Sequence, residues 1–204
     1  LIEAELVASG RNRIQVNRQR LHRTRDLLGA VRITVFSPDD LALIKGGPGL
    51  RRSYLDQLLV SVDPRNDALR SEFERALRQR NALLKQTRGR LDEAAELTLE
   101  VWDAKGVAAG EELALRRADL VTQIEPIVST AYGDVAGTPQ PISLRYEAPW
   151  RSIGLAEALR SARADELRRG LTLVGPHRDD LVVSLNELPS RTHSSQGEQR
   201  SLAL

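Results

Sequence analysis

The sequence contains no cysteine and no methionine, and only 3% of its 204 residues are aromatic. Without cysteine, disulfides, thiol nucleophiles and cysteine-ligated zinc are excluded for this stretch, and the composition fits a reducing compartment. Because aromatic residues are scarce, the core has to be built from Leu, Val, Ile and Ala, which favours helices and small sheets over an aromatic-rich sandwich. No apolar run approaches the roughly 18 residues of a membrane-spanning helix, and no signal peptide is visible.

The missing methionine includes the first position, which is Leu1 within the alternating stretch LIEAELVAS. We therefore interpret the sequence as a piece of a longer protein. Its length allows one large or two small domains. A content of 41% hydrophobic and 28% charged residues is typical of a globular chain rather than a disordered one.

Lysine is also scarce: of the 30 basic residues, only Lys45, Lys85 and Lys105 are lysine, and the others are arginine. The net charge is only +2. The planar guanidinium forms bidentate contacts with phosphates and carboxylates, so this bias favours anionic partners. A GC-rich genome, which favours arginine codons, explains the bias equally well.

Periodicity predicts a β–helical–β order along the chain. Alternating or β-branched stretches predict strands at 1–9, 13–16, 31–36, 142–147, 171–175 and 181–186, with a hairpin turn at Asn17-Arg18. Helix signals predict a short helix that starts at 37–40 and ends at 46–49, and further helices at 50–62, 64–90, 91–132 and 154–169. These patterns predict an α/β fold.

We expect two lobes from this order. Residues 1–36 and 171–204 are predicted to share a sheet-bearing lobe, and residues 37–170 to form a mainly helical second lobe. The two long helices should pack antiparallel as a hairpin, with an interruption of the second helix near Gly106 and Gly110.

The C-terminal stretch Ser195-Gln196-Gly197-Glu198-Gln199 precedes the apolar run of a helix. A helix N-terminus carries free N–H groups that bind anions, and glycine allows a phosphate to approach the backbone closely. Ser195 could donate to such a phosphate. Ordinary capping of the helix by Ser195 accounts for the same pattern.

Two further groups of residues are candidates for chemistry. GPHRDDL (175–181) places His177 and Arg178 beside two aspartates in a turn, where an internally satisfied turn with an Arg–Asp pair is favoured over a metal site. The arginine-rich run 11–25 could contact a nucleic-acid backbone, or it could be a solvated edge that deters strand pairing.

The adjacent arginines Arg51 and Arg52 open a predicted helix. Because neighbouring residues point about 100° apart on a helix, the two side chains should serve different partners. Asp56 lies four residues after Arg52, so a surface ion pair between them is the simplest expectation.

Five stretches together resemble one known family. They are FSPDDL (36–41), GGPGLRRSYLD (46–56), RQRNALLK (78–85), GPHRDD (175–180) and SSQGEQRSLAL (194–204). In this order and spacing they strongly resemble the RecF family of bacterial recombination and gap-repair proteins, which are ABC-type ATPases related to SMC proteins. The resemblance covers essentially the whole chain, most clearly from Val31 onward.

The resemblance implies an ATPase head lobe formed by 1–36 and 171–204, with the helical lobe 37–170 inserted. It also implies that the intact protein binds ATP and Mg²⁺, forms an ATP-dependent homodimer and binds single-stranded and double-stranded DNA at gaps. RecR and RecO would be its partners in loading recombinase. The implied setting is the cytoplasm, in DNA replication, recombination, repair and the SOS response.

The resemblance also assigns residues. Ser195, Gln196, Gly197, Glu198 and Gln199 match the ABC signature motif, which faces the γ-phosphate held by the opposite protomer. Phe36, Ser37, Pro38 and Asp39 match the segment that leads into the helical lobe, although the family usually has Pro-Glu-Asp there. Candidate nucleotide-proximal residues are therefore Ser37, Asp39, His177 and Arg178, and candidate DNA-binding residues are Arg11, Arg13, Arg18 and Arg20.

Two motifs of such ATPases are absent from the sequence. There is no G-x-x-x-x-G-K-[ST] phosphate loop, and no apolar run ending in Asp-Glu follows the signature helix. We therefore assign no catalytic and no metal-binding residue here, and expect slow ATP hydrolysis only from the intact dimer. Two alternatives stay open: a non-catalytic helical DNA-binding scaffold, and the head of another SMC-like protein.

Overall fold

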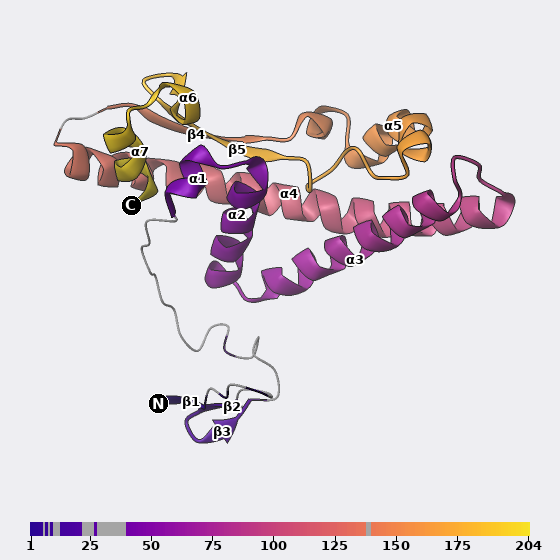
Figure 1. Ribbon diagram of the computed structural model, residues 1–204, viewed down its shortest axis with the longest axis horizontal. Coiled ribbons are helices and arrows are strands. Elements are labelled where there is room, and N and C mark those ends of the chain that lie inside the picture. Colours follow the sequence, from indigo (N-terminus) through magenta and orange to yellow (C-terminus); the bar gives the residue numbers. More distant parts are fainter. Residues whose placement is uncertain (6, 8, 10–12, 22–26, 28–39, 138–139) are drawn as a thin grey trace.

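The computed structural model describes residues 1–204 apart from 6, 8, 10–12, 22–26, 28–39 and 138–139 (Figure 1). Helices and two three-stranded sheets make up the described parts, in agreement with the predicted α/β class. No helix among these residues is both long and apolar enough to span a bilayer.

The N-terminal sheet consists of β1 (Ile2–Glu5), β2 (Arg13–Val16) and β3 (Gln19–Arg20), antiparallel and in that order. Asn17 and Arg18 both have positive φ, 51° and 67°, which is the conformation of the two-residue turns whose twist matches a hairpin. The predicted hairpin turn is thus confirmed, with arginine where glycine is the usual choice. The strand predicted at 31–36 lies outside the described residues.

Two long helices form the predicted antiparallel hairpin, α3 (Arg65–Gln86) and α4 (Glu93–Ala136), which lie side by side (Figure 1). The predicted interruption near Gly106 and Gly110 is wrong, because α4 runs through both. Gly110 serves packing instead. A Cβ there would lie 2.7 Å from Leu155 Cδ2 and 3.1 Å from Phe73 Cε2, so glycine allows two neighbours to approach the helix.

The second sheet is antiparallel and consists of β4 (Ile142–Glu147), β5 (Asp180–Leu185) and β6 (Leu188–Pro189). The strands at 142–147 and 181–186 are therefore confirmed, whereas the strand predicted at 171–175 is wrong. That stretch is irregular and is held by side chains. Asn81 Oδ1 accepts from the Thr172 amide at 2.7 Å, and Glu166 Oε1 accepts from the Leu173 amide at 2.8 Å.

The remaining helices are shorter than α3 and α4. They are α1 (Leu41–Lys45), α2 (Pro48–Val62), the 3-10 helix η3 (Pro149–Ser152), α5 (Leu155–Arg169), α6 (Ser190–His193) and α7 (Gln196–Ala203). Pro48 opens α2 two residues before the predicted start, as expected for proline at the first helical position. Gly170, at φ 65°, ends α5 where the sequence predicted its stop.

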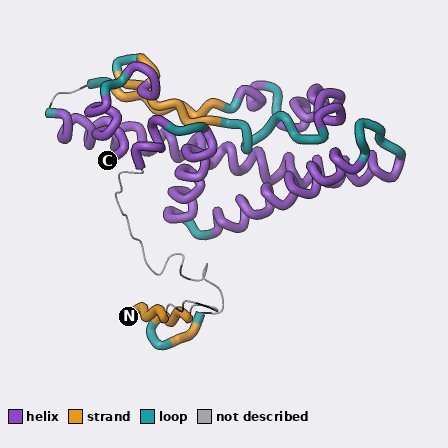
Figure 2. Tube along the Cα trace, viewed as in Figure 1, coloured by secondary structure: helices purple, strands orange, loops and turns teal. Residues whose placement is uncertain are grey.

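The core lies between the second sheet and the helices. Figure 2 shows the strands β4 and β5 running alongside the long helix α4. Buried residues from α2, α3, α4, β4 and β5 form one cluster: Leu55, Leu59, Phe73, Leu113, Leu120, Val121, Tyr132, Ile142, Leu144, Leu181 and Leu185, among others. The predicted two-lobe division stays a prediction. The sheet itself crosses residue 170, because β4 pairs with β5 along its length.

Candidate functional site

The N-terminus of α7 carries a capping box. Ser195 Oγ accepts from the Glu198 amide at 3.3 Å, and Glu198 Oε2 accepts from the Ser195 amide at 2.6 Å. The hydrogen bonds from Ser195 hold the pKa of Glu198 below its ordinary value, so this carboxylate stays ionised. Capping by Ser195, expected from the sequence, is confirmed.

The five residues of the motif differ in exposure. Ser195, Gln196 and Gly197 are exposed, Glu198 is half-buried and Gln199 is buried. Gln199 Nε2 donates to the carbonyl of Ser190 at 3.1 Å, which ties α7 to α6. The motif therefore has an outward part, at the first turn, and an inward part that fixes the orientation of that turn.

Gly197 is not required by its own surroundings. Among the described residues, a Cβ at this position would meet only Ser195 Oγ, at 4.0 Å. The amides of the first helical turn have no acceptor within the helix. An open glycine beside such amides leaves room for a second molecule to approach the backbone.

Helix α7 is held against the rest of the fold at its other side. Leu202 packs on the main hydrophobic cluster, and α7 contacts both α1 and α4. Burial and the charge of Glu198 raise the pKa of Tyr132, on α4, above its ordinary value. The packing of the rest of α7 on the core thus fixes the position of its exposed first turn.

The two aspartates of the 175–181 stretch point in different directions. Asp179 is buried, with Tyr146 Oη donating to it at 2.5 Å and Trp150 Nε1 at 2.7 Å. Burial raises the pKa of Asp179, while these hydrogen bonds oppose the rise. Asp180 accepts two hydrogen bonds from Arg51, at 2.7 and 2.8 Å. Among the described residues no group of three or more His, Asp or Glu could hold a metal ion.

Arg51 and Arg52 serve different partners, as their spacing predicts. Arg51 also donates to the carbonyl of Gly46 at 2.7 Å, so it pins the break between α1 and α2 to β5. Arg52 donates to the carbonyl of Asp179 at 2.8 Å. The expected Arg52–Asp56 ion pair is wrong, because Asp56 pairs with Arg117 from α4.

His177 and Arg178 share one acceptor. His177 Nε2 lies 3.1 Å from the carbonyl oxygen of Thr172, and an Arg178 nitrogen lies 3.4 Å from the same oxygen. Burial lowers the pKa of His177 to about 4, so the ring is neutral near pH 7. Arg178 is exposed. Ser37 and Asp39, the other two nucleotide-proximal candidates, lie outside the described residues.

Sequence reasoning missed two buried arginines that join the segments. Arg80 of α3 contacts Asp103 and Glu166 at 2.6 Å each. Arg117 of α4 reaches Asp56 at 2.8 Å and the carbonyl of Pro176 at 2.8 Å. The burial of Arg80 could have been predicted from the sequence, because Arg80 lies on the apolar stripe that contains Phe73 and Leu84 of the same helix.

The predicted DNA-binding arginines lie on the N-terminal sheet where they are described. Arg13, Arg18 and Arg20 are exposed, and Arg13 lies 3.4 Å from Glu5 on the neighbouring strand. Arg11 lies outside the described residues. The exposure of the described arginines is compatible with both expectations, a nucleic-acid contact and a solvated edge, so DNA binding stays a prediction.

Comparisons with curated proteins give close relatives. The chain is 43% identical over 217 residues to the DNA replication and repair protein RecF of Streptomyces avermitilis and 40% identical over 215 residues to that of Acidothermus cellulolyticus. Each alignment covers 100% of this chain and 58% of the relative. The chain therefore spans less than two thirds of the length of these relatives. No protein-family model matches it.

Solved structures give the same family. One described as the recombination mediator protein RecF-ATPrS in the RecFOR pathway superposes with a TM-score of 0.86 at 27% identity, over 99% of this chain and 56% of that one. A RecF-ATP structure of the same pathway matches with the same TM-score at 28% identity.

Proposed function

This chain belongs to the RecF family of DNA replication and repair proteins, and we propose that it forms part of an ATP-dependent, DNA-binding protein of recombinational repair. Its fold is the α/β fold of that ABC-type ATPase family. The observation that carries the proposal is the exposed first turn of α7, Ser195-Gln196-Gly197, held on a buried base in a chain so similar to RecF.

In the proposed function this turn contacts a nucleotide held by a second copy of the protein. The Ser195 hydroxyl and the free amides of the turn donate to the terminal phosphate, and the dipole of α7 favours its negative charge. Glu198 and Gln199 act differently, since Glu198 completes the cap and Gln199 anchors the turn on α6. The Mg²⁺ that accompanies ATP is assigned to residues outside this sequence.

His177 and Arg178 stay proposals as nucleotide-proximal residues, together with Ser37 and Asp39. The neutral, largely buried ring of His177 suits a supporting part rather than a direct phosphate contact. Arg178 is exposed and its guanidinium can donate charge-assisted hydrogen bonds, so of this described pair it is the residue suited to reach a phosphate.

DNA binding is proposed for the arginine face of the N-terminal sheet, with Arg11, Arg13, Arg18 and Arg20. Guanidinium groups on a strand surface neutralise backbone phosphates and read no base sequence, so binding should depend on salt rather than on sequence. The proposed partners are single-stranded and double-stranded DNA at gaps, RecR and RecO, with a second copy of the protein recruited by ATP, in the cytoplasm.

The test is Ser195→Arg in the intact protein. The substitution should leave nucleotide binding by each monomer nearly unchanged but abolish ATP-dependent dimerisation, because the bulky side chain fills the space for the partner's phosphate. Hydrolysis should fall with it, since transition-state stabilisation needs donors from both protomers. Sedimentation with and without ATP, a nucleotide titration and a melting curve measure these effects.

Thr192→Arg is the matched control, since Thr192 is exposed on α6 a few residues away and lies outside the motif. It should dimerise with ATP as the wild type does. If Ser195 only caps the helix, the substitution costs about 0.5–2 kcal/mol of stability without a selective effect on assembly. Dimerisation of the Ser195→Arg protein on addition of ATP would contradict the proposed contact.

A further inference from the structure

The first half of α4 exposes an apolar stripe that no described element covers. Its large members are Leu97, Val101 and Leu115, which are 60%, 53% and 46% exposed. Ala104 and Ala108 lie between them and are also exposed. The spacing of four, three, four and seven residues places all five on one side of the helix, which is the pattern of a seam that packs on another helix.

The shape of this stripe suits a helical partner. The two alanines in the middle allow a second backbone to approach closely, while the larger side chains at both ends provide contact area. The core-facing side of the same helix is already occupied, by Leu99, Leu113 and Arg117 among others. The stripe is therefore not used in packing within the described part of the chain.

The charge beside the stripe is strongly acidic. From Asp92 to Leu115 the sequence contains seven acidic residues and a single base, Lys105. Glu93, Glu96 and Glu100 are exposed and form no ion pair within the described part of the chain. Glu112, by contrast, is neutralised by Arg116 at 2.7 Å.

This charge distinguishes between possible occupants. A nucleic acid or an anionic lipid surface would bring phosphates against the acidic edge, and like charges repel. A second copy would bring one strongly acidic helix against another. A helix with Lys or Arg beside an apolar seam gains from both the burial and the charge.

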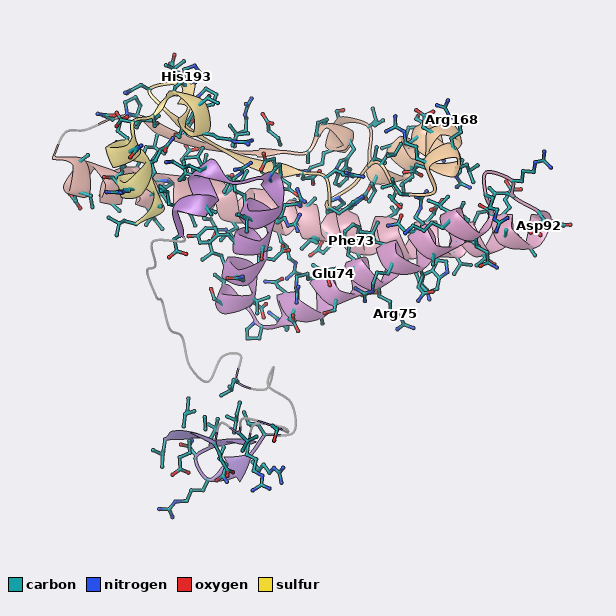
Figure 3. All side chains as sticks on the ribbon, viewed as in Figure 1. Phe73, Glu74, Arg75, Asp92, Arg168 and His193 are labelled. Atoms are coloured by element: carbon teal, nitrogen blue, oxygen red, sulfur yellow. The ribbon has the colours of Figure 1, made fainter. Side chains whose placement is uncertain are left out.

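We propose that the stripe Leu97, Val101, Ala104, Ala108 and Leu115 docks a basic amphipathic helix of a partner protein. The surface is separate from the α7 turn. Leu115 precedes Tyr132, the α4 residue beside α7, by 17 positions, or about 25 Å along the helix. In Figure 3 the stripe's half of α4 runs toward Asp92, at the end of the hairpin remote from His193 and α6. The inference does not rest on the nucleotide contact.

The probe is a fluorescein-labelled synthetic helix of about three heptads, with Leu and Ala at the seam and Lys and Arg beside it. Its affinity for the intact protein is measured by fluorescence anisotropy. The double variant Leu97→Ser/Val101→Ser should bind it at least about ten-fold more weakly, because two buried contacts are lost. Both side chains are exposed, so the melting curve should change little.

Ile127→Ser is the matched control, since Ile127 is 66% exposed on the same helix but lies outside the stripe. This variant should bind the labelled helix with Lys and Arg beside its seam, the basic peptide, as tightly as the wild type does. A second probe, the acidic peptide, has the same seam but Glu in place of the basic residues. The double variant Glu93→Lys/Glu100→Lys should bind the basic peptide more weakly than the wild type does, and the acidic peptide more tightly.

Four results would each overturn the proposal. The first is that the intact protein does not bind the basic peptide, and the second is that the double serine variant binds it as tightly as the wild type does. The third is that Ile127→Ser loses as much affinity as the double serine variant, and the fourth is that the wild type binds the acidic peptide as tightly as the basic one. Self-association of the wild type that the serine variant abolishes, seen by sedimentation, would identify a second copy as the occupant and would also overturn it.

Discussion

The interior and the C-terminal surface of this chain use polar residues in opposite ways. Arg51, Arg80 and Arg117 are buried, and each donates to a carboxylate from a distant segment. Each also donates to a neutral oxygen, which is the carbonyl of Gly46, the hydroxyl of Thr172 and the carbonyl of Pro176, respectively. Ser195 and Gly197, in the motif at α7, remain exposed. Arg51 and Arg80 lie in stretches that resemble one family, and so does the motif at α7. Resemblance alone therefore does not separate residues that hold the fold from residues that are free to meet a second molecule.

The difference has a physical origin. A charge removed from water must find nearly all of its hydrogen bonds inside the protein, so a buried arginine is committed to its partners. A helix N-terminus at the surface keeps amides that water or an anion can satisfy. Substitutions inside the fold should therefore act on stability, and substitutions at the surface turn should act on assembly.

Arg80→Met should have the largest effect on stability. The substitution removes the guanidinium that Glu166 and Asp103 share. Arg163 still contacts Asp103, but Glu166 is fully buried and loses its cation. Removing one partner of a buried pair costs about 3–5 kcal/mol. Urea unfolding of the intact protein measures the loss. Arg78→Met, two residues away on the exposed side, should cost less than about 1 kcal/mol, and equal losses for both variants would erase the distinction.

The pH dependence should come next in size. The pKa of His177 is about 4 in the fold and near the ordinary value of 6.5 when unfolded, so between these values the unfolded chain alone takes up the proton. Stability that is complete above pH 6.5 is therefore lost as the pH falls toward 4, by up to about 3 kcal/mol.

Urea unfolding of the wild type and of His177→Gln across this range measures that contribution as their difference. The raised pKa of Asp179 acts in the opposite direction and is common to both proteins. His193→Gln, at an exposed position, should keep the wild-type pH dependence. Identical pH profiles for wild type and His177→Gln would show that the ring is not held neutral by the fold.

Gly197→Ala should have the smallest effect on folding, and of the opposite sign. The added methyl meets only Ser195 Oγ, at 4.0 Å, and alanine favours the helix, so stability should rise by up to about 1 kcal/mol. ATP-dependent dimerisation should nevertheless weaken, because the methyl lies where the proposed phosphate approaches. Sedimentation beside a melting curve separates the two effects, and unchanged dimerisation would count against the close approach.

Wherever local periodicity or end signals set the structure, the sequence alone was sufficient. The helix hairpin, the strand at 142–147, the end of α5 at Gly170 and the cap at Ser195 all follow from the spacing and chemistry of neighbouring residues. The five ordered stretches were sufficient for the family as well, since they agree with the relatives and with the solved structures.

Tertiary contacts decided the rest, because they join residues whose spacing carries no signal. The β-branched pattern at 171–175 predicted a strand, but two of its amides donate to the side chains of Asn81 in α3 and Glu166 in α5. Glycine at 110 predicted a break in α4, but it is the space that Leu155 needs. The pairing of Asp56 with Arg117 rather than with Arg52, 61 residues apart instead of four, depends on which helices the fold brings together.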